Sequence, residues 1–153
     1  MGDVSIFDRL KQDHDSHRQL LDKMDKAESD DQLEKLFDQF KVEVTAHAAA
    51  EEESLYATML SRPDLREDAQ HSVSEHKEIE DYLEELGDFK FNSDSWRKTF
   101  DKMKDRYLHH IEEEEEEMFP GAAKELTAEE EEKLGKIFAK RKPAELERAQ
   151  AED

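Results

Sequence analysis

Two stretches of the sequence, HAAAEEESLY at residues 47–56 and HIEEEEEEMF at residues 110–119, repeat one pattern. Each begins with a histidine, which is followed by a glutamate four residues later and an aromatic residue nine residues later. These residues are His47, Glu51, Tyr56, His110, Glu114 and Phe119. Residues four apart lie on one face of an α-helix, about 6 Å apart along its axis, so two such helices facing each other can hold a pair of metal ions. The repeat therefore predicts a helical protein with metal ligands on its helices.

Composition limits the kind of metal site. The chain has 153 residues, which is enough for one domain with a sizeable core, and it has no cysteine. Disulfides, thiolate zinc sites and sulfur-ligated iron clusters are thereby excluded. Histidine and carboxylate are left as the strong metal donors.

Charge and hydropathy limit the partners. The net charge of −20, from 43 acidic and 23 basic residues, repels nucleic acid and anionic lipid, so neither is an expected partner. The sequence has neither an apolar stretch near the ~18 residues of a membrane span nor a basic-then-apolar leader. We therefore expect a soluble, cytoplasmic protein without membrane association.

Apolar residues recur with a helical period along the chain, and turn signals divide them into four long stretches. Because the connections are short, the sequence predicts an all-α fold, an up-down-up-down antiparallel four-helix bundle over residues 1–125. A capping box at residues 127–130 begins an extra short C-terminal helix, which we expect to pack across one end of the bundle. The rest of residues 126–153, from Pro143 onward, is expected to be a loosely attached polar tail of the same domain.

Each of the four predicted helices has a histidine in its apolar stripe, and three have a glutamate one turn later. These candidate metal ligands are His14, His47, Glu51, His76, Glu80, His110 and Glu114. A buried unpaired carboxylate is costly, so acids at equivalent interior positions are difficult to explain by packing, whereas a metal ion removes the cost. The seven donors suffice for two metals that share carboxylates, and a single zinc would need about four of them.

The run of glutamates at residues 112–117 weakens the assignment of His110, because any histidine just before the run has a glutamate four residues later. His109 pairs with Glu113 just as His110 pairs with Glu114. The offset to the following aromatic residue selects His110.

Three further residues have more than one interpretation. His71 lies off the face of the third-helix histidine, which favours a surface role. His17 is one turn from His14 and is either a ligand, a neighbour of one or, as we favour, a partly exposed polar residue. Tyr107 lies one turn before His110 on the same face, so its hydroxyl could reach the site as a hydrogen-bond donor or redox-active group, although core packing is the commoner role.

These motifs resemble the haemerythrin-like family, also called HHE cation-binding domains, over about residues 5–125. The matching segments are Asp13-His14, residues 47–56, residues 75–80, and residues 110–120 with its Phe-Pro. The resemblance implies a non-haem di-iron centre with two bridging carboxylates and an oxo or hydroxo bridge, with iron in preference to manganese or zinc. The resemblance also implies the ligand roles: the terminal ligands are His14, His47, His76 and His110, and the bridging ligands are Glu51 and Glu114.

Glu80 stands where the oxygen carriers of this family have a second histidine. An added anion favours ferric over ferrous iron, so we expect a protein that reacts with or senses O2, hydrogen peroxide or nitric oxide rather than one that carries oxygen. One alternative is an enzyme that decomposes hydrogen peroxide or oxidises ferrous iron. Another is an acidic helical interaction protein without a redox role. The sequence does not identify a protein partner.

Overall fold

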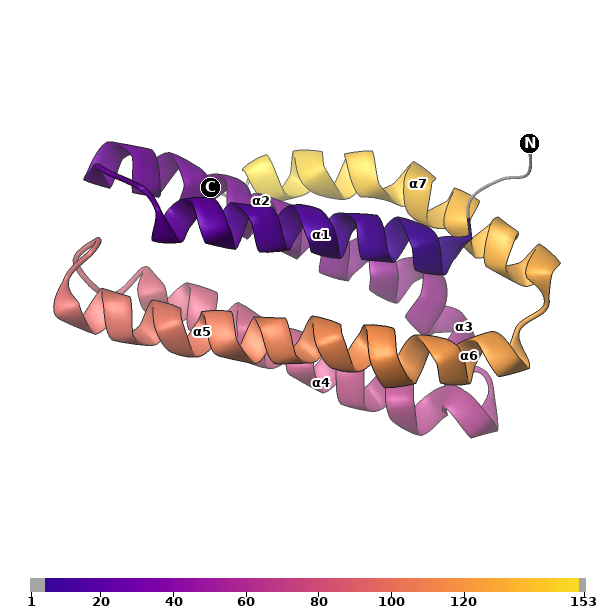
Figure 1. The fold of residues 1–153 in the computed structure, drawn as a ribbon. Coiled ribbons are helices and arrows are strands. Elements are labelled where there is room, and N and C mark those ends of the chain that lie inside the picture. Colours follow the sequence, from indigo (N-terminus) through magenta and orange to yellow (C-terminus); the bar gives the residue numbers. More distant parts are fainter. Residues whose placement is uncertain (1–4, 152–153) are drawn as a thin grey trace.

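The computed structural model describes residues 5–151, which form a bundle of long helices (Figure 1). The elements are α1 (Ile6–Asp25), α2 (Asp30–Glu51), η1 (Glu52–Tyr56), α3 (Ala57–Leu60), α4 (Pro63–Leu86), α5 (Asp94–Glu113), η2 (Glu114–Met118), α6 (Phe119–Glu125) and α7 (Ala128–Ala151). The single π-helical turns η1 and η2 continue directly into α3 and α6, so α2–α3 and α5–α6 are two long rods. Together with α1 and α4 they run up, down, up and down, which confirms the predicted all-α bundle.

The helix starts follow from local chemistry. Ser5, Ser29 and Ser93 precede α1, α2 and α5, and each side-chain oxygen accepts a hydrogen bond from a backbone N–H of the first turn. Pro63 occupies the first turn of α4, where its missing N–H costs nothing. Polar caps at the turns thus set the limits of the helices that carry the candidate ligands.

Helix α7 corrects two details of the sequence prediction. Its capping box is present, because Thr127 Oγ1 and the Glu130 carboxylate each accept a hydrogen bond from the other residue's backbone N–H. The helix has 24 residues, however, and lies along α1 and α2 rather than across one end of the bundle (Figure 1). The expected loose tail is helical to Ala151, because Phe138, Glu145 and Ala149 form a buried face on both sides of the exposed Pro143.

The core has a polar layer between two apolar clusters. One cluster includes Phe7, Leu55 and Phe119, and the other includes Phe40 and Phe100. On α1 and α4 the buried polar side chains fall between the residues that the helix contributes to the two clusters, and on the other two rods the buried histidine and glutamate lie where one cluster gives way to the other. Apolar packing therefore shields the polar layer from both ends. Among the described helices, none is long and apolar enough to cross a membrane.

Candidate metal centre

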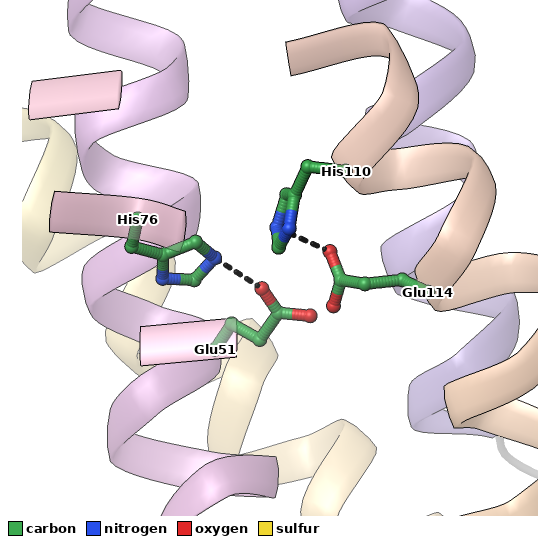
Figure 2. Close-up of side chains that lie close together, drawn as sticks. All are labelled: Glu51, His76, His110 and Glu114. Carbon is green, nitrogen blue, oxygen red and sulfur yellow. Dashed lines mark ion pairs between the residues drawn. The ribbon is translucent and has the colours of Figure 1, made fainter. Parts of the chain in front are cut away.

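One half of the polar layer is built around Glu51, which is fully buried at the end of α2. Its Oε1 lies 3.7 Å from His47 Nε2 and 3.2 Å from His76 Nε2. Figure 2 shows the His76 ring pointing at this carboxylate from α4. Two imidazoles from different helices thus converge on one carboxylate oxygen.

The other half repeats this arrangement around Glu114, at the start of η2. Its Oε1 lies 2.9 Å from His110 Nε2 and 3.7 Å from His14 Nε2. In Figure 2 the carboxylates of Glu51 and Glu114 face each other across the space between the helices. Six of the seven ligands expected from the sequence therefore lie in one cluster, and four of them come from the two repeated motifs.

A carboxylate holds the outer ring nitrogen of all four histidines. The Nδ1 contacts are His14 to Glu115 at 2.7 Å, His47 to Asp13 at 2.9 Å, His76 to Glu52 at 3.0 Å and His110 to Glu75 at 2.8 Å. A carboxylate at Nδ1 favours the tautomer with its proton on that atom, which leaves the Nε2 lone pair free to bind a metal. The outer contacts therefore orient all four Nε2 atoms for metal binding.

Most inner atoms of the cluster lack a hydrogen bond. Nε2 of His14 and His47 and both oxygens of Glu51 are buried and make no hydrogen bond with any described residue, and Nε2 of His110 and Oε1 of Glu114 have each other as their close contact. Buried polar atoms of this kind are costly unless something satisfies them. A cation would satisfy all of them at once, and a set of imidazole and carboxylate donors suits iron, manganese or zinc.

The charges of the cluster also favour a cation. Burial and the neighbouring charge of Glu114 raise the pKa of Glu51 well above its ordinary value. Burial also acts to raise the pKa of Glu114, but the charge of His110 outweighs it and keeps this pKa well below its ordinary value. Burial lowers the pKa of His47 to about 4, so this ring is neutral near neutral pH. Two carboxylates this close in the interior are costly to charge together, and a cation between them would remove that cost.

The π-helical turns explain why the aromatic residue follows its histidine by nine positions. On a regular α-helix such a residue would lie about 180° around the axis, away from the histidine. The wider turn accommodates one extra residue and rotates the aromatic side chain back toward the cluster. Tyr56 consequently stacks on His76 with ring centroids 5.3 Å apart, and Phe119 stacks on His14 at 6.0 Å.

The interpretation of His17 as a partly exposed residue was wrong. Its side chain is fully buried, its ring centroid lies 5.2 Å from that of His47, and its Nδ1 lies 2.6 Å from the Tyr107 hydroxyl. Its Nε2 is buried without a hydrogen-bond partner among residues 5–151. The sequence did contain a signal, since residue 17 follows His14 by three positions within the same apolar stripe. The hydroxyl of Tyr107 thus contacts His17, while its ring packs beside the predicted ligand His110 with centroids 6.4 Å apart.

Glu80 is exposed and lies outside the cluster. His76 is already at the edge of the buried stripe of α4, and a residue four positions later is rotated by about 40° farther toward solvent. Glu80 instead lines a cavity of about 400 Å³ between α2 and α4, whose walls include His76, Val44 and Ala48. His71 and His109 are both exposed at 55% and 65%, which agrees with a surface position.

The helical bundle and its buried layer of histidines and glutamates are features of a metal-binding helical protein. The chain belongs to the family described as Hemerythrin HHE cation binding domain, which matches residues 5–122. The family resemblance expected from the motifs is thereby confirmed, and the protein is a haemerythrin-like metal-binding protein.

Two known proteins are similar to this chain, one in structure and one in sequence. The crystal structure of an HHE cation-binding domain-containing protein from Mycobacterium kansasii, an Rv2633c homolog, has the same fold, with a TM-score of 0.85, 23% identity, and coverage of 97% of this chain and 91% of that one. A protein of a Nostoc species named DNA nickase is 25% identical over 136 residues, which is 89% of this chain and 38% of that protein. The chain therefore spans less than half the length of this curated relative.

Proposed function

We propose that the polar layer holds two iron ions and that the protein reacts with or senses O2, hydrogen peroxide or nitric oxide. The observation that carries the proposal is the repeated half-site, in which one carboxylate oxygen lies between two Nε2 atoms from different helices. Two equivalent halves with facing carboxylates suit two metals with shared ligands. A single zinc ion would leave several of these donors unsatisfied.

The proposed ligands are the six clustered side chains together with His17. Those six are His14, His47, His76, His110, Glu51 and Glu114. A proton on Nδ1 of His17, directed at Tyr107, would leave its buried Nε2 free for a metal ion. Glu80, being exposed, no longer supports the argument that an extra anion disfavours reversible oxygen carriage.

Access by a small molecule has separate support. The cavity beside His76 is lined mainly by aliphatic side chains, most of them from α2 and α4, and its lining also includes Lys41, Glu52, Glu80 and Glu84. Small neutral molecules such as O2, hydrogen peroxide and nitric oxide can cross an apolar lining that disfavours larger anions. The cavity thus favours chemistry with a small ligand over a purely structural metal.

An enzyme that decomposes hydrogen peroxide or oxidises ferrous iron is the second candidate. Tyr56, fully buried, donates a 2.7 Å hydrogen bond to Glu114 Oε2, which puts a phenol in direct contact with a proposed bridging ligand. Such a phenol can supply a proton or an electron to the centre. The net charge of −20 does not favour DNA, the substrate in the name of the Nostoc relative, as a partner of this chain.

Metal analysis of protein from iron-replete cells, together with its ultraviolet and visible spectrum before and after hydrogen peroxide, tests the proposal. We expect two irons per chain and oxo-to-iron charge-transfer bands that respond to peroxide. Recovery of the bands as peroxide disappears would support the enzyme. The Glu51→Gln variant should lose iron, whereas the matched Glu80→Gln variant should retain it. Well under one iron per chain in the unmodified protein would refute the di-iron centre.

A further inference from the structure

Two cavities with different chemistry reach the cluster from opposite sides of α4. The one beside His76, between α2 and α4, is large and mainly apolar. The other, of about 70 Å³, lies between α4 and the α5–η2 rod and includes Glu114 in its lining. Most of its remaining lining is acidic or imidazole: Asp68, His71, Glu75, Glu113 and Glu117. The second cavity is the better route for cations, because its walls supply negative charge and metal donors.

A group of metal donors lies at the outer part of this cavity. His71 Nε2 is 3.0 Å from Glu113 Oε1 and 3.5 Å from Glu75 Oε2. One donor atom from each residue falls within 4.8 Å of the others, which is close enough for one cation to contact all three. Exposure of the side chains falls from 55% at His71 to 28% at Glu113 and 3% at Glu75, so the group extends from solvent into the interior.

Glu75 connects this outer group to the buried centre. Its Oε1 accepts a hydrogen bond from His110 Nδ1 at 2.8 Å, while its Oε2 faces His71 and also lies 2.8 Å from Arg106 Nη2. The cavity then reaches Glu114, a carboxylate that is 98% buried and whose Oε1 faces the Nε2 atoms of His110 and His14, two proposed metal ligands. A buried metal donor thus lies at the inner side of a cavity that begins at the exposed His71 and the half-buried Glu113.

We propose that divalent transition-metal cations reach the centre through this cavity, with His71 and Glu113 as the capture site and Glu114 as the first buried ligand. The inference rests on the metal binding proposed above, but it concerns the route and not the identity of the metal. Imidazole at the capture site favours transition metals over magnesium or calcium. The volume of about 70 Å³ admits a partly hydrated ion, since one water molecule takes about 30 Å³.

The test is the rate at which metal-free protein takes up Co²⁺, followed by the absorbance of the bound ion after rapid mixing. We expect the His71→Asn/Glu113→Gln variant to load at least tenfold more slowly than the unmodified chain but to reach the same final stoichiometry. The matched control is Glu80→Gln/Glu84→Gln, which removes acids from the other cavity and should load at the unmodified rate. Both variants change exposed or half-buried positions, and equal final stoichiometry verifies that the centre is intact.

The outcomes separate the route from the function. Unmodified loading rates in the His71→Asn/Glu113→Gln variant, or slower loading in the Glu80→Gln/Glu84→Gln control alone, would overturn the route and leave the metal centre in place. Failure of the unmodified chain to take up Co²⁺ would overturn the metal centre and the route together.

Discussion

The hydroxyl of Tyr56 donates a 2.7 Å hydrogen bond to Oε2 of Glu114, a residue 58 positions later in the chain. The donor is the last residue of the first repeated motif and the acceptor belongs to the second, so the bond ties the two halves of the cluster together. The contact depends on the π-helical turn η1, which rotates Tyr56 toward the interior.

Replacing Tyr56 with Phe should destabilise the metal-free protein by about 1–3 kcal/mol, because a buried carboxylate oxygen loses its donor. Urea unfolding at neutral pH measures the change. The matched variant is Tyr82→Phe, which removes a hydroxyl from a half-buried tyrosine outside the cluster and should cost less than about 0.5 kcal/mol. Equal losses in the two variants would contradict a specific role for the Tyr56 hydroxyl.

Asp13 should strengthen metal binding without touching the metal. Its Oδ2 lies 2.9 Å from His47 Nδ1 and 2.7 Å from Lys142 Nζ, and these two groups hold its pKa well below the ordinary value although burial acts to raise it. Changing Asp13 to Asn should weaken metal binding about 10- to 100-fold, as measured by competition with a chelator, because the ring of His47 loses its anionic partner. Asp22→Asn on the exposed side of α1 is the control and should bind as the unmodified chain does. An unchanged affinity in Asp13→Asn would show that packing alone orients His47.

His17 and Glu80 give opposite predictions. A His17→Asn variant should bind metal at least tenfold more weakly or at lower stoichiometry, because a buried imidazole near the cluster is removed. Glu80→Gln should bind normally because its side chain is exposed. Metal titration of both variants decides the matter, and the reverse result would restore the ligand set inferred from the sequence.

The stability of the metal-free protein should depend on pH through His110. Burial acts to lower the pKa of His110, but the carboxylates of Glu114 and Glu75 outweigh it and raise this pKa to about 9, against an ordinary value of 6.5. The folded protein therefore retains a proton that the unfolded chain releases between these values. The resulting stabilisation is complete below pH 6.5 and is lost as the pH rises through 9.

Unfolding experiments at several pH values can isolate this effect. The difference in free energy of unfolding between the metal-free protein and its His110→Asn variant should shrink by about 3 kcal/mol from pH 6.5 to about pH 10. The neighbouring His109 is 65% exposed, so the same comparison with His109→Asn should be nearly flat. A flat difference for both variants would mean that His110 is not charged in the folded protein.

Helix α7 should contribute to the stability of the whole bundle. Phe138 is buried against the bundle, with its ring centroid 5.8 Å from that of His47. Phe138→Ala should lower the free energy of unfolding by about 3 kcal/mol through the cavity it leaves, while Ile137→Ala, at a half-buried position, should cost about 1 kcal/mol. Thermal or urea unfolding measures both. Similar small losses would indicate that α7 is only weakly attached to the bundle.

The sequence by itself determined the helical fold and most of the candidate centre. Helical periodicity and the polar caps are local properties, so they predicted the four long helices and their limits. The spacing of His47 to Glu51 and of His110 to Glu114 is also local, because residues four apart share a face on any α-helix. These local patterns identified the six clustered side chains without knowledge of the tertiary structure.

Only the tertiary structure decided the rest. The exposure of Glu80 depends on the rotation of α4 against α2, and the burial of His17 depends on how α1 meets α2, α5 and α7. Likewise, the acids that hold the outer ring nitrogens come from other helices in every case, as with Glu75 and His110, so no spacing could reveal them. The physical reason is that helical periodicity fixes which residues share a face, whereas contacts between helices depend on rotation and register, which are set by packing.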